Sequence, residues 1–210
     1  MGELAVHLSP KVETQKLDEE QRNWIAKFNI PNLDRPNKTI HKTESWEIRG
    51  NESEFVTWKR TLNTHTLQFD GASKGNPGPS GGGGIIQDPN QDTVLKYAIG
   101  LGIDTNNRAE ALALWQGLNL AIKQNIHDII VIGDSRLIIN ALVKNTSTQS
   151  THLQILLDKI RLITSKLHTC QFYHVLRDHN SNADQEANQG VKLKAGTLSI
   201  NGTMTQVEIP

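Results

Sequence analysis

The stretch Leu67–Gly78 constrains the fold of this chain most strongly, because a short apolar run ends there on Asp70 and a glycine-rich turn follows at once. The apolar run suits a β-strand, which would hold the carboxylate rigidly at its end. The glycines of the turn supply the backbone freedom that a reversing chain requires. An Asp after a strand is most often a turn former, so a chemical role for Asp70 depends on the rest of the chain.

Length and composition restrict the class of protein. The 210 residues suffice to bury the core of one domain with an appendage. No apolar stretch reaches the length of a membrane span and the N-terminus lacks a secretory pattern, so we expect an intracellular protein without membrane contact. Cys170 is the only cysteine, which excludes a thiolate-rich metal site. The net charge is zero, so binding of a polyanion would need a local patch or a bridging cation.

The pattern divides the chain into three parts. Residues 1–62 form an extension of unknown role that we expect to be partly helical, with an amphipathic helix at 18–28 and another short element at 54–60. Residues 63–192 carry the regular pattern of a domain, which we expect to fold and act without residues 1–60. Residues 193–210 form a tail, and its Asn-Gly pair predicts a hairpin.

The domain is predicted to be α/β, with a five-stranded mixed sheet whose first three strands are antiparallel and whose faces carry helices. Alternating or β-branched runs predict strands at 65–70, 81–87, 93–99, 129–132 and 172–176. Apolar residues at helical spacing predict helices at 105–124, 135–144, 151–167 and 182–191.

Four acids fall at the ends or starts of these elements. Asp70 and Asp134 end strands that can lie side by side, Glu110 lies in the first turns of a helix, and Asp184 begins the last helix. At one edge of the sheet they would repel one another unless a cation is bound, and oxygen ligands favour Mg²⁺ or Mn²⁺. Each acid taken alone could instead be a cap or turn residue.

The sequence around each acid forms a recognisable block. The four blocks are Phe69–Pro79, Asn106–Glu110, Gly133–Ser135 and Asn180–Asn188. They resemble, in the same order, the signature blocks of the type 1 ribonuclease H family. The resemblance covers about residues 64–192 and is closest to the ribonuclease H domains of non-LTR retrotransposons. It implies a ribonuclease H-like fold for the predicted sheet and its C-terminal hairpin.

The resemblance implies a reaction for the four acids. Asp70, Glu110, Asp134 and Asp184 would hold two Mg²⁺ ions, with Mn²⁺ as a substitute, and would cut the RNA strand of an RNA–DNA hybrid. The products would carry a 3′-hydroxyl and a 5′-phosphate. The hybrid is the expected partner, a reverse-transcriptase or other retroelement module is a second candidate partner, and we expect a monomer.

The resemblance also implies the residues that contact the hybrid and its 2′-hydroxyl groups. These are Gly71, Ala72, Ser73, Asn76, Asn106, Asn107 and Arg136. Many family members carry a longer loop with a His before the last acid, and this chain has only Arg177–Asn180 there. We therefore expect Arg177 or His179 to supply a cation that faces a phosphate.

Two other functions compete with this interpretation. A catalytically silent, retroelement-derived module could bind hybrids or act as a scaffold, although the presence of all four acids argues against decay. A nuclease of the wider fold superfamily, such as an integrase or resolvase, is disfavoured because the Asn106–Glu110 block belongs with RNA-strand recognition.

Overall fold

The computed structural model describes residues 47–48 and 50–210, which belong to the unit Asn37–Pro210. The helix expected at 18–28 lies outside the described residues. The elements in chain order are β1 (Glu47–Ile48), α2 (Glu52–Arg60), β2 (His65–Ser73), β3 (Gly78–Gln87), β4 (Thr93–Asp104), α3 (Asn106–Lys123), β5 (Asp128–Gly133), α4 (Arg136–Val143), α5 (Thr151–Thr164), β6 (Thr169–Val175), the 3₁₀ turn η1 (Arg177–Asn180), α6 (Ser181–Gly190), β7 (Thr197–Ile200) and β8 (Thr203–Gln206).

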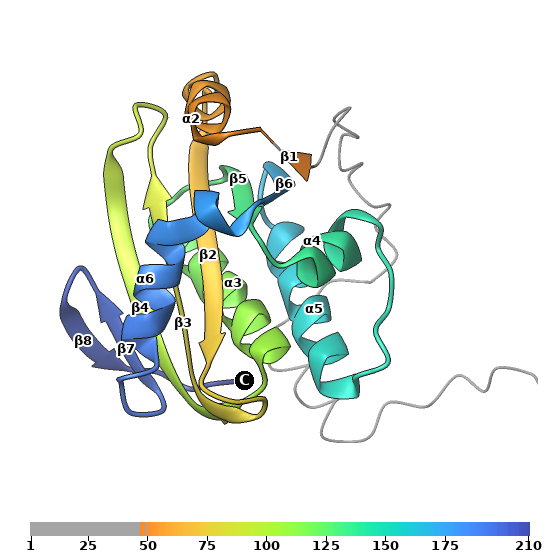
Figure 1. Ribbon diagram of the computed structural model, residues 1–210, viewed down its shortest axis with the longest axis vertical. Helices are drawn as coiled ribbons and strands as arrows, with labels where there is room; N and C mark the ends of the chain where they lie inside the picture. Colours follow the sequence, from red (N-terminus) through yellow and green to blue (C-terminus); the bar gives the residue numbers. More distant parts are fainter. Residues whose placement is uncertain (1–46, 49) are drawn as a thin grey trace, which may run out of the picture. The chain divides into compact units, whose positions relative to one another are not determined.

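The strands of this part of the chain form one sheet in the order β1-β6-β5-β2-β3-β4-β7-β8 (Figure 1). The strands β2, β3 and β4 are antiparallel, whereas β5 and β6 continue from β2 in parallel, which confirms the predicted mixed sheet. The predicted strand count was incomplete. The hairpin β7–β8 extends the same sheet through β4, and β1 adds a short strand beside β6. These pairings join segments far apart in sequence, so local patterns do not reveal them.

Helices cover both faces of the sheet. The larger core lies between the sheet and α3, α4 and α5, and Leu67, Phe69 and Leu112 are among its fully buried side chains. The long helix α3 begins where the sequence predicts, because the side chain of Thr105 accepts a hydrogen bond from the backbone of Arg108. The other face carries α6 and α2.

Consecutive glycines of β3 allow a helix on each face to approach the sheet backbone. A Cβ on Gly82 would lie 2.8 Å from the Cβ of Ala113 in α3. A Cβ on Gly83 would lie 2.4 Å from the carbonyl carbon of Glu186 in α6. Alternate residues of a strand point to opposite faces, so this run places helices close above and below β3. The glycine-rich strand thereby fixes how α6 meets β2 and β3.

A second, smaller core lies beneath α2. The sequence pattern placed this helix in the extension formed by residues 1–62. Helix α2 contributes the buried Phe55 to this core. Phe55 packs there against residues of β5 and β6, namely Ile130, Ile132, Tyr173 and Val175. Residues 47–48 and 50–62 are therefore packed onto the domain. A deletion of residues 1–60 would remove β1 and α2 and expose this apolar face.

Among the described residues, no helix combines the length and the apolar character that crossing a bilayer requires.

Gly83→Ala should destabilise the protein, because the added methyl group would meet the backbone of α6. We expect a loss of about 1–3 kcal/mol in the free energy of unfolding, which is typical of overpacking. Urea denaturation followed by circular dichroism measures it, with Thr93→Ala at the exposed start of β4 as the control. A change for Gly83→Ala of less than about 0.5 kcal/mol would contradict the close approach.

Candidate active site

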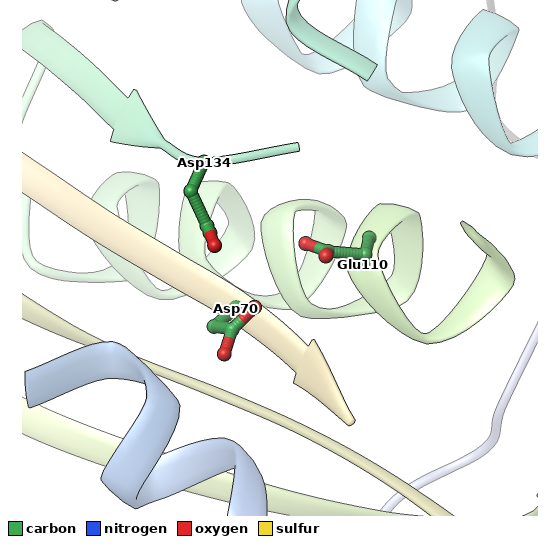
Figure 2. Close-up of side chains that lie close together, drawn as sticks. All are labelled: Asp70, Glu110 and Asp134. Atoms are coloured by element: carbon green, nitrogen blue, oxygen red, sulfur yellow. The ribbon is translucent and has the colours of Figure 1, made fainter. Parts of the chain in front are cut away.

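Three of the four acids come together at one edge of the sheet. Asp70, Glu110 and Asp134 each offer a carboxylate oxygen, and these oxygens all lie within 4.8 Å of one another (Figure 2). Figure 2 shows the three side chains directed toward one another from β2, from α3 and from the segment that follows β5. Asp70 and Glu110 are buried and Asp134 is partly exposed, so the group opens to solvent on one side.

The topology explains why these acids meet. The pairing of β5 with β2 ends at Ile132 and Gln68, so the β2 backbone beyond this point has no β5 residue beside it. Asp70 lies at this free edge, and Asp134 directly follows the end of β5. The carboxyl ends of parallel strands are a common place for binding sites in α/β proteins.

Gly71 allows the third acid to approach. A Cβ at this position would lie 2.1 Å from the backbone nitrogen of Glu110, so only glycine permits this contact between β2 and α3. The backbone N–H of Gly71 also donates a hydrogen bond of 2.9 Å to Oδ1 of Asp70. The glycine after the acid thus both orients the Asp70 carboxylate and brings Glu110 to it.

Burial and mutual repulsion disfavour the charged forms of these carboxyl groups. Burial is the main cause that raises the pKa of Asp70 from 3.8 to about 7; Asp134 and Asp184 add to it, whereas the Gly71 N–H and Arg177 oppose it. Burial, followed by the charges of Asp70 and Asp134, also raises the pKa of Glu110 well above its ordinary value. A bound cation would remove this repulsion.

The donor set fits a hard divalent cation. The three residues offer only carboxylate oxygens, which are the ligands that Mg²⁺ and Mn²⁺ prefer. The buried Oε2 of Glu110 has no hydrogen-bond partner among the described residues, which is costly for a buried polar atom unless a ligand compensates it. The geometry therefore supports metal binding at this edge.

Asp184 does not belong to this close group of three. Its Oδ1 accepts a hydrogen bond of 3.1 Å from the guanidinium of Arg177, and its Oδ2 accepts one of 2.9 Å from Asn188. It lies near enough to Asp70 to raise the pKa of that carboxyl group. Asp184 is thus oriented by two donors beside the group, and its role as a metal ligand stays a prediction.

Most of the residues expected to contact a hybrid line the same edge. The side-chain oxygen of Asn76 accepts a hydrogen bond of 3.1 Å from the backbone of Asn106, so the turn after β2 lies against the start of α3. Asn76, Asn106 and Asn107 are exposed. Gly71, Ala72 and Ser73 continue β2 beyond Asp70. The exposed Asn side chains thus lie on the turn after β2 and on the first residues of α3, the two elements that also carry Asp70 and Glu110.

Arg136, Arg177 and His179, which were also expected to contact the hybrid, have different surroundings. The guanidinium of Arg136 is exposed and forms a close ion pair with Glu47 of β1. Arg177 has 79% of its side chain exposed and pairs with Asp184. Its exposed guanidinium thus lies beside the acids, and contact with a phosphate stays a prediction.

His179 requires a correction. The sequence suggested a phosphate-facing ring, but the structure buries this ring against α2. Its Nδ1 lies 2.7 Å from Oε2 of Glu52, and its Nε2 lies 2.7 Å from the carbonyl oxygen of Gly50. Burial lowers the pKa of His179, but the bonds to Gly50 and Glu52 outweigh it, so the pKa is raised overall. Both ring nitrogens are engaged and neither is available to a phosphate.

Sequence reasoning assigned no role to Asn180, which is almost fully buried. Its Nδ2 donates hydrogen bonds of 2.8 Å to Oδ1 of Asp134 and to the carbonyl oxygen of Phe69, the residue before Asp70. It thereby joins the two strand ends that carry acids. Its place in the Asn180–Asn188 block was the available signal, but the contact with Asp134 is a tertiary one.

Comparison with known proteins agrees with the fold. The sequence model of a family described as "Reverse transcriptase-like" matches residues 68–190, which is more than half of the chain. The crystal structure of RNase H1 from the halophilic archaeon Halobacterium salinarum NRC-1 has a TM-score of 0.59 and 31% identity, and the match covers 61% of this chain and 98% of that one. This chain belongs to the type 1 ribonuclease H family.

Two further similar proteins are informative. The Bifunctional protein Rv2228c of Mycobacterium tuberculosis is 32% identical over 144 residues, and the match covers 67% of this chain but 39% of that protein. LC11-RNase H1 was solved in complex with an RNA/DNA hybrid; it has a TM-score of 0.57 and 28% identity, with 61% of this chain and 97% of that chain covered. The chain spans well under half the length of the mycobacterial relative.

The burial of Asp70 should make the free energy of unfolding of the metal-free protein depend on pH. Because its folded-state pKa is raised from 3.8 to about 7, the protonated carboxyl stabilises the fold at low pH, and this contribution is lost as the pH rises through 7. At about pH 8 in chelator, Asp70→Asn should therefore be more stable than the wild type, by on the order of 1–4 kcal/mol.

Thermal unfolding at several pH values measures this difference. The gap should close toward about pH 3, below the unfolded-state pKa of 3.8, where the wild-type carboxyl is protonated in both the folded and the unfolded state. Added Mg²⁺ should raise the melting temperature of the wild type more than that of Asp70→Asn. A variant that is less stable than the wild type in chelator at high pH would show that the acid is not strained in the folded protein.

Proposed function

We propose that this chain is an endoribonuclease that hydrolyses the RNA strand of RNA–DNA hybrids, leaving a 3′-hydroxyl and a 5′-phosphate. The observation that carries the proposal is the close group of Asp70, Glu110 and Asp134, whose carboxylate oxygens lie within 4.8 Å of one another and of which the first two are buried. Its position at the edge of a ribonuclease H fold, and the hybrid bound to LC11-RNase H1, support it.

The four acids would hold two Mg²⁺ ions, or Mn²⁺ in their place. Two such ions can activate an attacking water and stabilise the leaving 3′-oxygen of a phosphodiester. Asp70 lies near two of the other acids, since the charges of Asp134 and Asp184 both help to raise its pKa. Asn180 keeps Asp134 close to β2, and Arg177 orients Asp184. The protein thus arranges the ligands before any substrate arrives.

The polar edge beside the acids would distinguish RNA from DNA. Asn76 and the start of α3 form one surface, to which Asn106 and Asn107 contribute exposed side chains. Such groups can donate to and accept from a ribose 2′-hydroxyl, which DNA lacks. Arg177 would contact a phosphate near the cut. The monomeric state and an association with a reverse-transcriptase module stay predictions.

A cleavage assay with a labelled RNA–DNA hybrid tests the function. The wild type should cut the RNA strand with Mg²⁺, lose activity in chelator and spare duplex DNA. Asp70→Asn should lower kcat by about a thousandfold or more, because it removes a group on which the whole site depends. Asp92→Asn, which removes the same charge from the exposed β3–β4 turn, is the matched control.

The outcomes separate the competing functions. A wild type that is folded but inert, and that binds hybrids equally well with and without chelator, would identify the silent binding module instead. Equal cleavage of duplex DNA would contradict RNA-strand selectivity and indicate a nuclease of the wider superfamily.

Arg177→Gln should weaken hybrid binding by removing one phosphate contact. The slope of log affinity against log salt should decrease in magnitude by about one. Fluorescence anisotropy across a salt series measures this slope, and the Asp70→Asn background prevents cleavage. Lys123→Gln at the exposed end of α3 is the charge-matched control. An unchanged slope would place Arg177 away from the phosphates.

A further inference from the structure

The turn η1 is held by residues that precede the domain. Both ring nitrogens of His179 are bound, one to Glu52 and one to the carbonyl oxygen of Gly50, each at 2.7 Å. The ring also stacks on Phe55, with centroids 4.8 Å apart and an angle of 6° between the planes. We call Gly50, Glu52, Phe55 and Lys59 the amino-terminal clasp.

The backbone of η1 is held from the same side. The side chain of Gln68 donates a hydrogen bond of 3.1 Å to the carbonyl oxygen of His179. Lys59 in turn donates to Gln68 at 2.6 Å and to Gln87 at 2.5 Å, with its amine buried between β2 and β3. The clasp therefore contacts the His179 ring directly and its carbonyl through Gln68.

The residues on either side of His179 contact the acids. Asn180, the next residue, donates at 2.8 Å to Oδ1 of Asp134 and to the backbone of β2 beside Asp70. Arg177, two residues before it, donates at 3.1 Å to Asp184. Any shift of η1 would move both donors, so the orientation of Asp134 and Asp184 depends on where His179 is held.

We propose that His179 is a positioning residue, by which the amino-terminal clasp sets the orientation of Asp134 and Asp184 for metal binding. The proposal rests on the proposed metal-dependent function of the acid group. It assigns to the segment before the family blocks a role in the site itself. The contacts of His179 do not reach the metal ligands directly; they act through Asn180 and Arg177.

A purely structural role for α2 is the alternative. The apolar contacts of Phe55 and the ring contact between Trp58 and Tyr173 stabilise the domain whether or not they influence the acids. The two roles differ in one measurable respect. A structural role lowers stability alone, whereas a positioning role also weakens metal binding at equal stability.

Three full-length variants separate these roles. His179→Phe keeps an aromatic ring against Phe55 and removes both hydrogen bonds. Glu52→Ala removes one hydrogen-bond partner of His179. Because the Glu52 side chain is 67% exposed, this variant should fold normally. Ile160→Val shortens a fully buried side chain in α5 and serves as the control for lost stability.

Mn²⁺ binding to the protein without hybrid is the primary readout, followed by calorimetry or electron paramagnetic resonance. His179→Phe should weaken Mn²⁺ binding by about 3–10-fold, less than the 10–100-fold that is typical when a direct partner of a ligand is lost. Glu52→Ala should give a smaller loss in the same direction, and His179→Gln, which restores one donor, should recover part of the affinity. Ile160→Val should not change it.

Hydrogen exchange and kinetics complete the test. Amides of residues 177–184 should exchange faster in His179→Phe than in Ile160→Val, and kcat should fall while KM for the hybrid stays within about twofold. Mn²⁺ affinity equal to that of Ile160→Val would overturn the proposal. If the wild type proves inert on hybrids, the proposed function fails, yet the Mn²⁺ and exchange comparisons still decide the role of His179.

Discussion

Repulsion among three crowded carboxylates is the constraint on which the rest of this structure depends. Asp70, Glu110 and Asp134 hold oxygens within 4.8 Å of one another, and the first two are buried. Without a cation, burial and neighbouring charge raise the pKa of Asp70 to about 7, which makes the charged site unfavourable. The fold must hold these groups together against that repulsion, and rigid strand ends with a closely packed helix are suited to do so.

The surrounding structure supplies this rigidity from two directions. From within the domain, Gly71 lets α3 touch β2, and the glycines of β3 let α6 pack close on the other face. From the segment before the domain, α2 packs on the second face of β5 and β6 and contacts η1 through His179. The same turn carries Asn180 and Arg177, which orient two acids. Packing of the amino-terminal segment and geometry of the site are therefore coupled through one short turn.

Local patterns predicted much of the domain for clear physical reasons. The β-branched run Ile129–Ile132 was interpreted as a strand buried on both faces, and the structure agrees because Ile129 and Val131 face one core and Ile130 and Ile132 the other. The helix after Thr105 was predicted from its apolar spacing and its cap. The sequence offered Arg177 or His179 as the phosphate-facing cation and did not reveal the inward contacts of His179, because its partner Glu52 lies 127 residues earlier in the chain.

By itself, the sequence determined the chemical types at the site and the elements that carry them: acids at strand ends, a glycine after Asp70 and the four family blocks. Only the tertiary structure decided which acids meet, that Asp184 is instead held by Arg177 and Asn188, and that His179 turns inward. The reason is that periodicity and capping act over a few residues, whereas these distances depend on where β5 stops beside β2 and on how α2 packs against the sheet.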